Sequence, residues 1–167
     1  FKKIIDEHQV EKVKAFGTAA LRTASNGQAF ISQVKANIGI NIQIISGSEE
    51  ARLIHHGVTK AVPFDDQKGL IMDIGGGSVE FIIADKDQVY GAESFPIGVA
   101  VLFNRFHKND PITKEEINQI NQFLTDTLKP LFDALQQYPT HYLIGASGTF
   151  DVLENMLATE KTHPLHA

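Results

Sequence analysis

Cysteine and tryptophan are both absent from this sequence of 167 residues. Without cysteine, disulfide bonds and thiolate metal sites are excluded, which fits a reducing, cytoplasmic environment. No run of about eighteen apolar residues and no charged-then-apolar leader occurs, so the sequence predicts no membrane partner and no secretion. An excess of basic residues is missing too: the formal net charge of −5 argues against broad nucleic-acid binding. A polyanionic partner would therefore need a local positive field.

Apolar residues are present in sufficient amount for a folded core, at 43% of the chain. Their spacing predicts an α/β protein, with helices over 1–8, 25–39, 47–57 and 111–138. Strand patterns occur near 13–21, 40–46, 69–74, 79–85 and 88–97, and residues 141–157 predict a strand, a glycine loop and a helix.

Several residues mark the ends of these helices. Asn26 is the predicted N-cap and Gly39 the predicted stop of the helix over 25–39. Thr113 and Glu116 have the spacing of a capping box, and Pro130 should kink or split the helix that follows.

The polar stretch 61–69 contains a proline and predicts a link between two lobes. Residues 1–66 are expected to be the remainder of an N-terminal lobe, and residues 67–167 a second lobe. The sequence begins at Phe1, without methionine and inside an amphipathic pattern, so we expect a fragment of a longer protein.

The segment "DIGGGS" at 73–78 carries the strongest chemical signal in the sequence. It lacks the lysine of a Walker A loop, and strand-like residues follow where a dinucleotide fingerprint requires a helix. Between two strands, the backbone N–H groups of Gly75, Gly76, Gly77 and Ser78 can converge on an anion. Asp73 at the mouth of this loop, joined by Glu80, indicates a cation such as Mg²⁺ beside phosphate.

Two simpler interpretations stay open from the residues alone. The first loop is also compatible with a glycine-rich hairpin whose Asp73 bonds its own turn. A second glycine loop, "GASGT" at 145–149, precedes a helix and can hold a phosphate or nucleotide. Alternatively, it is only a helix start capped by Ser147 or Thr149.

Three blocks occur in order along the chain: "GTAALRTASN", "ISGSEEARL" and "DIGGGSVE". Together they resemble the exopolyphosphatase and pppGpp phosphohydrolase (Ppx/GppA) family of the acetate kinase, sugar kinase, Hsp70 and actin superfamily. The resemblance covers about residues 10–157. Val79 stands where the family often has threonine, and the family's first phosphate loop, of DxGSNS type, is not contained in this sequence.

The resemblance implies a two-lobed, ribonuclease H-like (actin-like ATPase) α/β fold with mixed sheets and flanking helices. It implies that Glu50 is the catalytic base acting on water, that Arg22 binds phosphate, and that Asp73 and Glu80 serve Mg²⁺. From the residues alone, Glu49 and Glu50 also fit plain compensation of a helix dipole, and Arg22 a surface ion pair. Arg52, two residues from Glu50, is expected to be structural.

The expected activity is Mg²⁺-dependent hydrolysis of terminal phosphoanhydride bonds of inorganic polyphosphate, with homodimer formation compatible with this assignment. A pppGpp 5′-phosphohydrolase, acting on guanosine polyphosphate, is the closest alternative. A non-catalytic phosphate or nucleotide sensor and an ATP-dependent kinase or Hsp70-like ATPase are further alternatives on the same fold.

Overall fold

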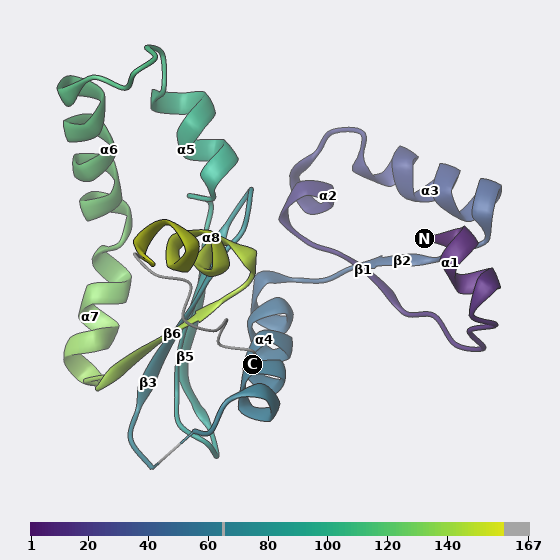
Figure 1. Cartoon of the computed structure of the whole chain (residues 1–167), viewed down its shortest axis with the longest axis horizontal. Coiled ribbons are helices and arrows are strands. Elements are labelled where there is room, and N and C mark those ends of the chain that lie inside the picture. Colours follow the sequence, from purple (N-terminus) through teal and green to yellow (C-terminus); the bar gives the residue numbers. More distant parts are fainter. Residues whose placement is uncertain (65, 159–167) are drawn as a thin grey trace. The chain divides into compact units, whose positions relative to one another are not determined.

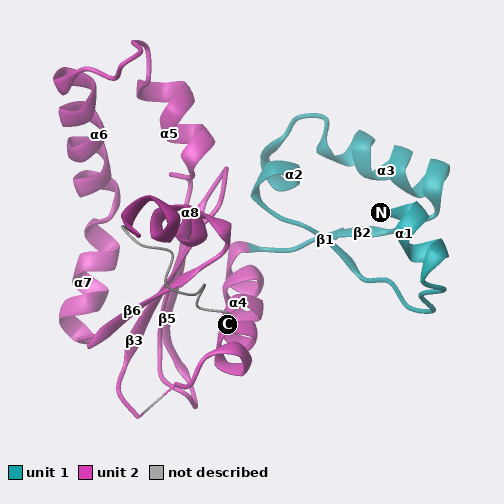
Figure 2. Ribbon diagram, in the orientation of Figure 1, with its two compact units in different colours: residues 1–46 teal, residues 47–167 magenta. Residues whose placement is uncertain are grey.

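The computed structural model describes residues 1–64 and 66–158. The chain divides into two compact units, residues 1–46 and 47–167 (Figure 2). Within the described ranges, no helix combines the length and apolar character needed to cross a membrane.

The first unit contains three helices and a small parallel sheet, within its described residues. The elements are α1 (Lys2–Glu7), β1 (Ala15–Gly17), α2 (Ala19–Thr23), α3 (Gly27–Ile38) and β2 (Ile42–Ile44), and β1 pairs with β2 in parallel. Gly39 ends α3 in the left-handed conformation, at φ 72°, so the predicted stop is confirmed. Asn26 is the N-cap residue, but its side chain forms no capping hydrogen bond.

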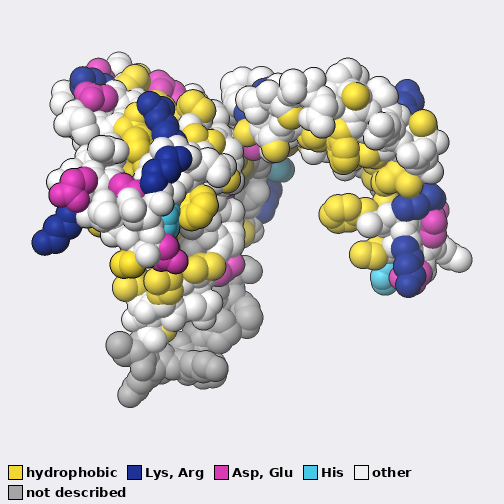
Figure 3. All heavy atoms as spheres, turned by 90° about the horizontal axis from the view of Figure 1, so that it is seen from above, with side chains coloured by type: hydrophobic (Ala, Val, Ile, Leu, Met, Phe, Trp, Pro, Cys, Tyr) yellow, Lys and Arg dark blue, Asp and Glu magenta, His cyan; other side chains and the backbone are white. Residues whose placement is uncertain are grey.

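One side of the first unit is apolar and hollowed. A groove of about 530 Å³ lies between α1, α3 and the two strands, and its lining includes Phe16, Phe30 and Ile42. Figure 3 shows hydrophobic side chains gathered on this unit. An apolar lining of this kind does not suit a phosphate chain, because it offers few hydrogen-bond donors to a polyanion.

The second unit is built on a four-stranded mixed sheet (Figure 1). Its strands are β3 (Gly69–Ile74), β4 (Val79–Ala84), β5 (Val89–Phe95) and β6 (Tyr142–Ala146), in the order β5-β4-β3-β6. The first three form the antiparallel meander predicted from the sequence, and β6 adds to β3 in parallel.

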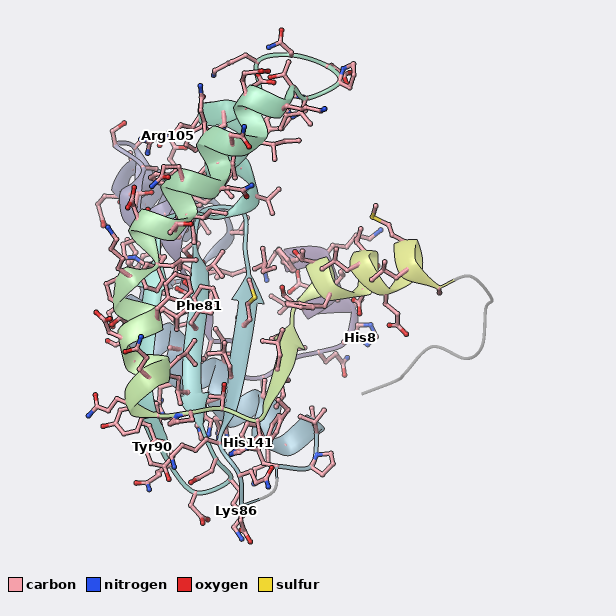
Figure 4. The ribbon with its side chains drawn as sticks, turned by 90° about the vertical axis from the view of Figure 1, so that its left-hand side faces the viewer. His8, Phe81, Lys86, Tyr90, Arg105 and His141 are labelled. Atoms are coloured by element: carbon pink, nitrogen blue, oxygen red, sulfur yellow. The ribbon has the colours of Figure 1, made fainter. Side chains whose placement is uncertain are left out.

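Helices cover both faces of this sheet. On one face, α4 (Gly47–Ala61) packs Ala51 onto the fully buried Ile71 and Ile82. On the other face, α6 (Lys114–Thr127) and α7 (Lys129–Gln137) cover a core around Phe81. Figure 4 shows Phe81 on that side of the sheet, and Lys86 and Tyr90 at the sheet end that carries the β4–β5 turn.

The α/β class with a mixed sheet and flanking helices is confirmed, but three details differ from the prediction. Helix α4 continues past Gly57 to Ala61 because its apolar face remains in contact with the sheet. The same packing places α4 in the second unit, whereas the predicted boundary after residue 66 assigned it to the first lobe. The short helices α2 and α5 (Val99–Phe106) were not predicted, since brief apolar runs do not distinguish helix from strand.

The predicted capping box at the start of α6 is confirmed, and α6 and α7 are separate helices with Pro130 in the first turn of α7. Glu116 is buried, 6% exposed, and its carboxylate ties the preceding loop to α6. One carboxylate oxygen accepts from the backbone of Lys108 at 2.8 Å and of Asn109 at 3.1 Å, and the other accepts from the Thr113 N–H at 2.7 Å.

These hydrogen-bond donors stabilise the ionised form of the Glu116 carboxylate, so its ionisation contributes to the stability of the fold. The Thr113 N–H and the other donors lower the pKa of Glu116 from 4.5 to about 2. Because the folded pKa is the lower one, this stabilisation is complete above about pH 4.5 and is lost as the pH falls toward 2.

We therefore expect Glu116→Gln to lower the urea midpoint at pH 7, with a smaller difference from wild type at pH 3. Urea unfolding at both pH values measures this effect. Glu115→Gln is the matched control, because Glu115 is an exposed neighbour in the same first turn. Equal midpoints for the two variants at pH 7 would contradict the role assigned to Glu116.

Candidate phosphate-binding site

A row of polar residues crosses the sheet of the second unit at its glycine-loop end. Asp73 on β3 pairs with Glu80 on β4, and Glu80 pairs with Ser94 on β5. Directly paired residues project from the same face of a sheet. The strand alternation places them on the α4 face, which they share with Ile71 and Ile82. The two carboxylates therefore lie side by side beside the glycine loop.

Glu80 is the most enclosed member of this row, at 2% exposure. Its Oε1 accepts hydrogen bonds from the hydroxyls of Ser78 and Ser94, each at 2.6 Å. Within the described part of the chain, no side chain donates a hydrogen bond to Oε2. Oε2 is also not among buried side-chain atoms that lack a partner, so it retains some contact with solvent. One oxygen of Glu80 is thus held by the protein, and the other can meet a ligand.

The bond to Glu80 limits what the Ser78 hydroxyl can do. An ionised carboxylate only accepts hydrogen bonds, so the single hydroxyl proton of Ser78 is directed at Glu80. The same proton cannot be given to a phosphate at the same time. The prediction that Ser78 binds phosphate therefore depends on its backbone N–H.

The first turn of α5 forms backbone hydrogen bonds with the glycine loop. The N–H groups of Val99 and Ala100 donate to the carbonyls of Gly75 and Gly76, both at 3.0 Å. These are first-turn donors, which have no partner inside their own helix. Among the described residues, the N–H groups of Gly76 and its neighbour Gly77 have no backbone acceptor. The Gly75 N–H donates to the Ser78 carbonyl at 3.0 Å inside the turn, so it is not one of the anion donors that the sequence predicted. The loop thus presents the N–H groups of Gly76 and Gly77 for an anion while its carbonyls are occupied.

Gly76 itself is not required by the fold. It is exposed, its backbone does not lie in the left-handed region, and a Cβ added there would meet nothing within 4 Å. A glycine at this position instead suits the close approach of another group to the backbone.

The second glycine loop lies next to the first. Strand β6 runs parallel to β3, with Ala146 paired to Asp73. The hydroxyls of Ser147 and Thr149 donate to the carbonyl of Ile74, at 3.3 and 2.9 Å. Ser147 is the N-cap residue of α8 (Gly148–Leu157) but makes no capping bond, so the interpretation of its hydroxyl as a cap was wrong. A phosphate or nucleotide at this loop stays a prediction.

The first turn of α4 reaches the polar row. A Cβ added to Gly47 would lie 2.8 Å from the Cβ of Ser94, so the helix begins directly against β5. Glu49 forms a two-point ion pair with Arg52, with both N–O distances at 2.8 Å, and this bond lowers the pKa of Glu49. Arg52 is thus paired with Glu49 at the surface, and its structural role stays a prediction. Glu50 is half-buried and lies about 100° further around the helix.

The carboxylates of the row can hold a cation with few protein ligands. Within residues 1–64 and 66–158, no cluster of three or more histidine, aspartate or glutamate side chains is placed to hold a metal. Asp73 and Glu80 offer two carboxylates on one face. This number suits Mg²⁺, which retains waters and binds phosphate oxygens besides one or two carboxylates.

Arg22 belongs to the first unit. It lies in the last turn of α2, and its guanidinium donates to the carbonyl of Ile45 at 2.8 Å. This bond anchors the side chain to the segment that follows β2. The role predicted for Arg22 in binding phosphate stays a prediction, as does that of Glu50 in activating water.

Comparison with known proteins shows that this chain is similar to phosphatases and related phosphoanhydride hydrolases. The model of the Ppx/GppA phosphatase family matches residues 1–165. The guanosine-5′-triphosphate,3′-diphosphate pyrophosphatase of Photobacterium profundum is 31% identical over 160 residues, which cover 96% of this chain and 32% of that protein.

Solved structures agree with this match. The crystal structure of an exopolyphosphatase from Cytophaga hutchinsonii is 43% identical with a TM-score of 0.90, over 93% of this chain and 50% of that one. The PPX-GPPA enzyme of Aquifex aeolicus is 32% identical with a TM-score of 0.72, over the same shares. The ribonuclease H-like fold is thereby confirmed. The chain spans about a third of the curated relative and half of each solved chain.

Proposed function

Because this chain belongs to the Ppx/GppA phosphatase family, we propose that it carries part of the active site of an exopolyphosphatase. The protein would hydrolyse the terminal phosphoanhydride bond of inorganic polyphosphate and release orthophosphate. The chain spans only part of the length of its relatives. The proposed activity is therefore that of the whole protein, to which these residues contribute one part of the site.

One observation carries the proposal: a glycine loop with occupied carbonyls lies beside two paired carboxylates, Asp73 and Glu80. Outward N–H groups suit phosphate oxygens, and adjacent carboxylates suit a cation that those oxygens share. Asp73 and Glu80 would hold Mg²⁺, which supplies neutralisation of charge on the transferring phosphoryl group when bound.

Phosphoanhydride hydrolysis also requires a positioned water. Glu50 is the proposed base that orients this water and accepts its proton. Its place in the first turn of α4 supports this role, because that turn begins against Ser94, in the same row as Glu80. The helix N-terminus favours the ionised carboxylate that a base needs.

Inorganic polyphosphate, and not pppGpp, is the proposed preferred substrate. Identity is higher to the Cytophaga exopolyphosphatase, 43%, than to the Photobacterium guanosine pentaphosphate enzyme, 31%, and this difference favours polyphosphate. Side-by-side kinetics of the full-length protein on polyphosphate, pppGpp and ATP test the choice. A higher kcat/KM on pppGpp would assign the alternative activity, and tight binding without turnover would indicate a sensor.

The metal is tested through Asp73. We expect Asp73→Asn to raise the Mg²⁺ concentration that gives half-maximal rate by about 10-fold or more, because the variant removes one of two carboxylate charges at the proposed site. Phosphate release measured across a Mg²⁺ titration checks this. Asp133→Asn on α7 is the control, because α7 packs on the opposite face of the sheet. An unchanged Mg²⁺ requirement in Asp73→Asn would contradict the assignment.

A further inference from the structure

We propose that Ser94 is a positioning residue that orients the Glu80 carboxylate for its cation. The inference rests on the proposed function, since it concerns how the same site is held. No sequence motif pointed to Ser94, which lies near the end of β5 in the segment "ESFPIG". Two contacts single it out, one created by strand pairing and the other by helix packing.

The first contact is with Glu80. Ser94 pairs directly with Glu80 across β4 and β5, and its hydroxyl donates to Oε1 at 2.6 Å. The hydroxyl of Ser78 donates to the same oxygen, also at 2.6 Å. Two donors on Oε1 leave one carboxylate orientation, in which Oε2 is the oxygen that can meet a ligand.

The second contact is with α4. Gly47 passes so close that a Cβ added there would lie 2.8 Å from the Cβ of Ser94 and 3.3 Å from its Oγ. Ser94 therefore occupies the position where β5, Glu80 and the beginning of α4 meet. The adjacent Glu93 alternates to the other face of β5 and is exposed. Only one of these two neighbouring side chains is thus directed at the site.

A group that orients a metal-binding carboxylate acts on metal affinity without touching substrate. Removing such a partner typically costs about 10- to 100-fold in metal affinity or activity. The loss should fall on the Mg²⁺ requirement and on kcat. The KM for polyphosphate at saturating Mg²⁺ should change much less, because Ser94 lies behind Glu80 and not at the glycine loop.

The test compares Ser94→Ala and Ser94→Cys with Glu93→Gln in the full-length protein. Cysteine keeps the size of serine but donates hydrogen bonds poorly. We expect both Ser94 variants to need about 10-fold or more Mg²⁺ for half-maximal rate, and Glu93→Gln to match wild type. Urea midpoints establish that all three variants are folded.

Metal binding is also measured without catalysis, by titrating Mn²⁺ and following the free-ion signal by electron paramagnetic resonance. Weaker Mn²⁺ binding in both Ser94 variants supports the proposal, even if the wild-type protein hydrolyses none of the substrates and the proposed function fails. Wild-type behaviour of Ser94→Cys, or unchanged Mn²⁺ binding in Ser94→Ala, would overturn it. In those cases Ser94 fills space beside Gly47 and does not orient Glu80.

Discussion

Replacing Glu50 with glutamine is expected to lower kcat for phosphate release from polyphosphate by about 10²- to 10⁴-fold, the usual contribution of a general base. Glutamine has the size of glutamate but cannot accept the proton of the attacking water. Substrate binding should persist, because the proposed phosphate contacts come from the glycine loop at 75–78. Polyphosphate binding by calorimetry and phosphate release by a colorimetric assay separate the two effects.

Glu49 supplies a matched control within the same helical turn. Its carboxylate is paired to Arg52 at two points, so Glu49→Gln removes an exposed ion pair. Such pairs contribute little to stability, and activity should stay within about two-fold of wild type. If Glu50→Gln retains wild-type turnover, or if both variants lose activity equally, Glu50 is not the base.

Gly98→Ala is expected to have the second largest effect, through the glycine loop. A Cβ at position 98 would lie 2.5 Å from the carbonyl carbon and oxygen of Gly76 and 2.6 Å from the nitrogen of Gly77. Those atoms are backbone, so either the loop or α5 must move. Gly98 has φ −61°, which alanine adopts readily, so the penalty is steric.

Overpacking of this kind costs about 1–3 kcal/mol of stability. A displacement of the loop by about 1 Å would also lower kcat/KM by about 100-fold. Urea unfolding and steady-state kinetics measure both quantities. Wild-type values for both would show that α5 does not hold the loop.

Gly57→Ala is the control for Gly98→Ala, since it makes the same change where space is available. Gly57 lies within α4, and a Cβ added there would meet nothing within 4 Å. The variant should leave activity unchanged and raise stability by about 0.5–1 kcal/mol, because alanine favours the helix more than glycine does. If Gly57→Ala raises the free energy of unfolding and Gly98→Ala lowers it, the loss of stability in Gly98→Ala comes from the contact of the new Cβ with the glycine loop.

The sequence predicted well the features that depend on neighbouring residues. The sequence predicted that Asp73 and Glu80 lie together beside the glycine loop, and the strand register pairs them directly. Gly39, the capping box at Thr113 and Pro130 acted as expected, because each works within one or two turns of its own helix. The order of three short blocks was sufficient to indicate the family, and the family match confirms it.

The residues that hold the site were not predictable in the same way. Ser94 reaches Glu80 only through the pairing of β5 with β4, and Gly98 reaches Gly76 only because α5 folds back onto the glycine loop. The sequence by itself thus determined the fold class, the family, and which loop and carboxylates are the candidate chemical groups. Tertiary structure alone decided that the hydroxyls of Ser147 and Thr149 donate to the carbonyl of Ile74, and that α4 packs with the second unit. These contacts join segments far apart in the chain, and periodicity within a segment carries no information about which distant groups will share a hydrogen bond.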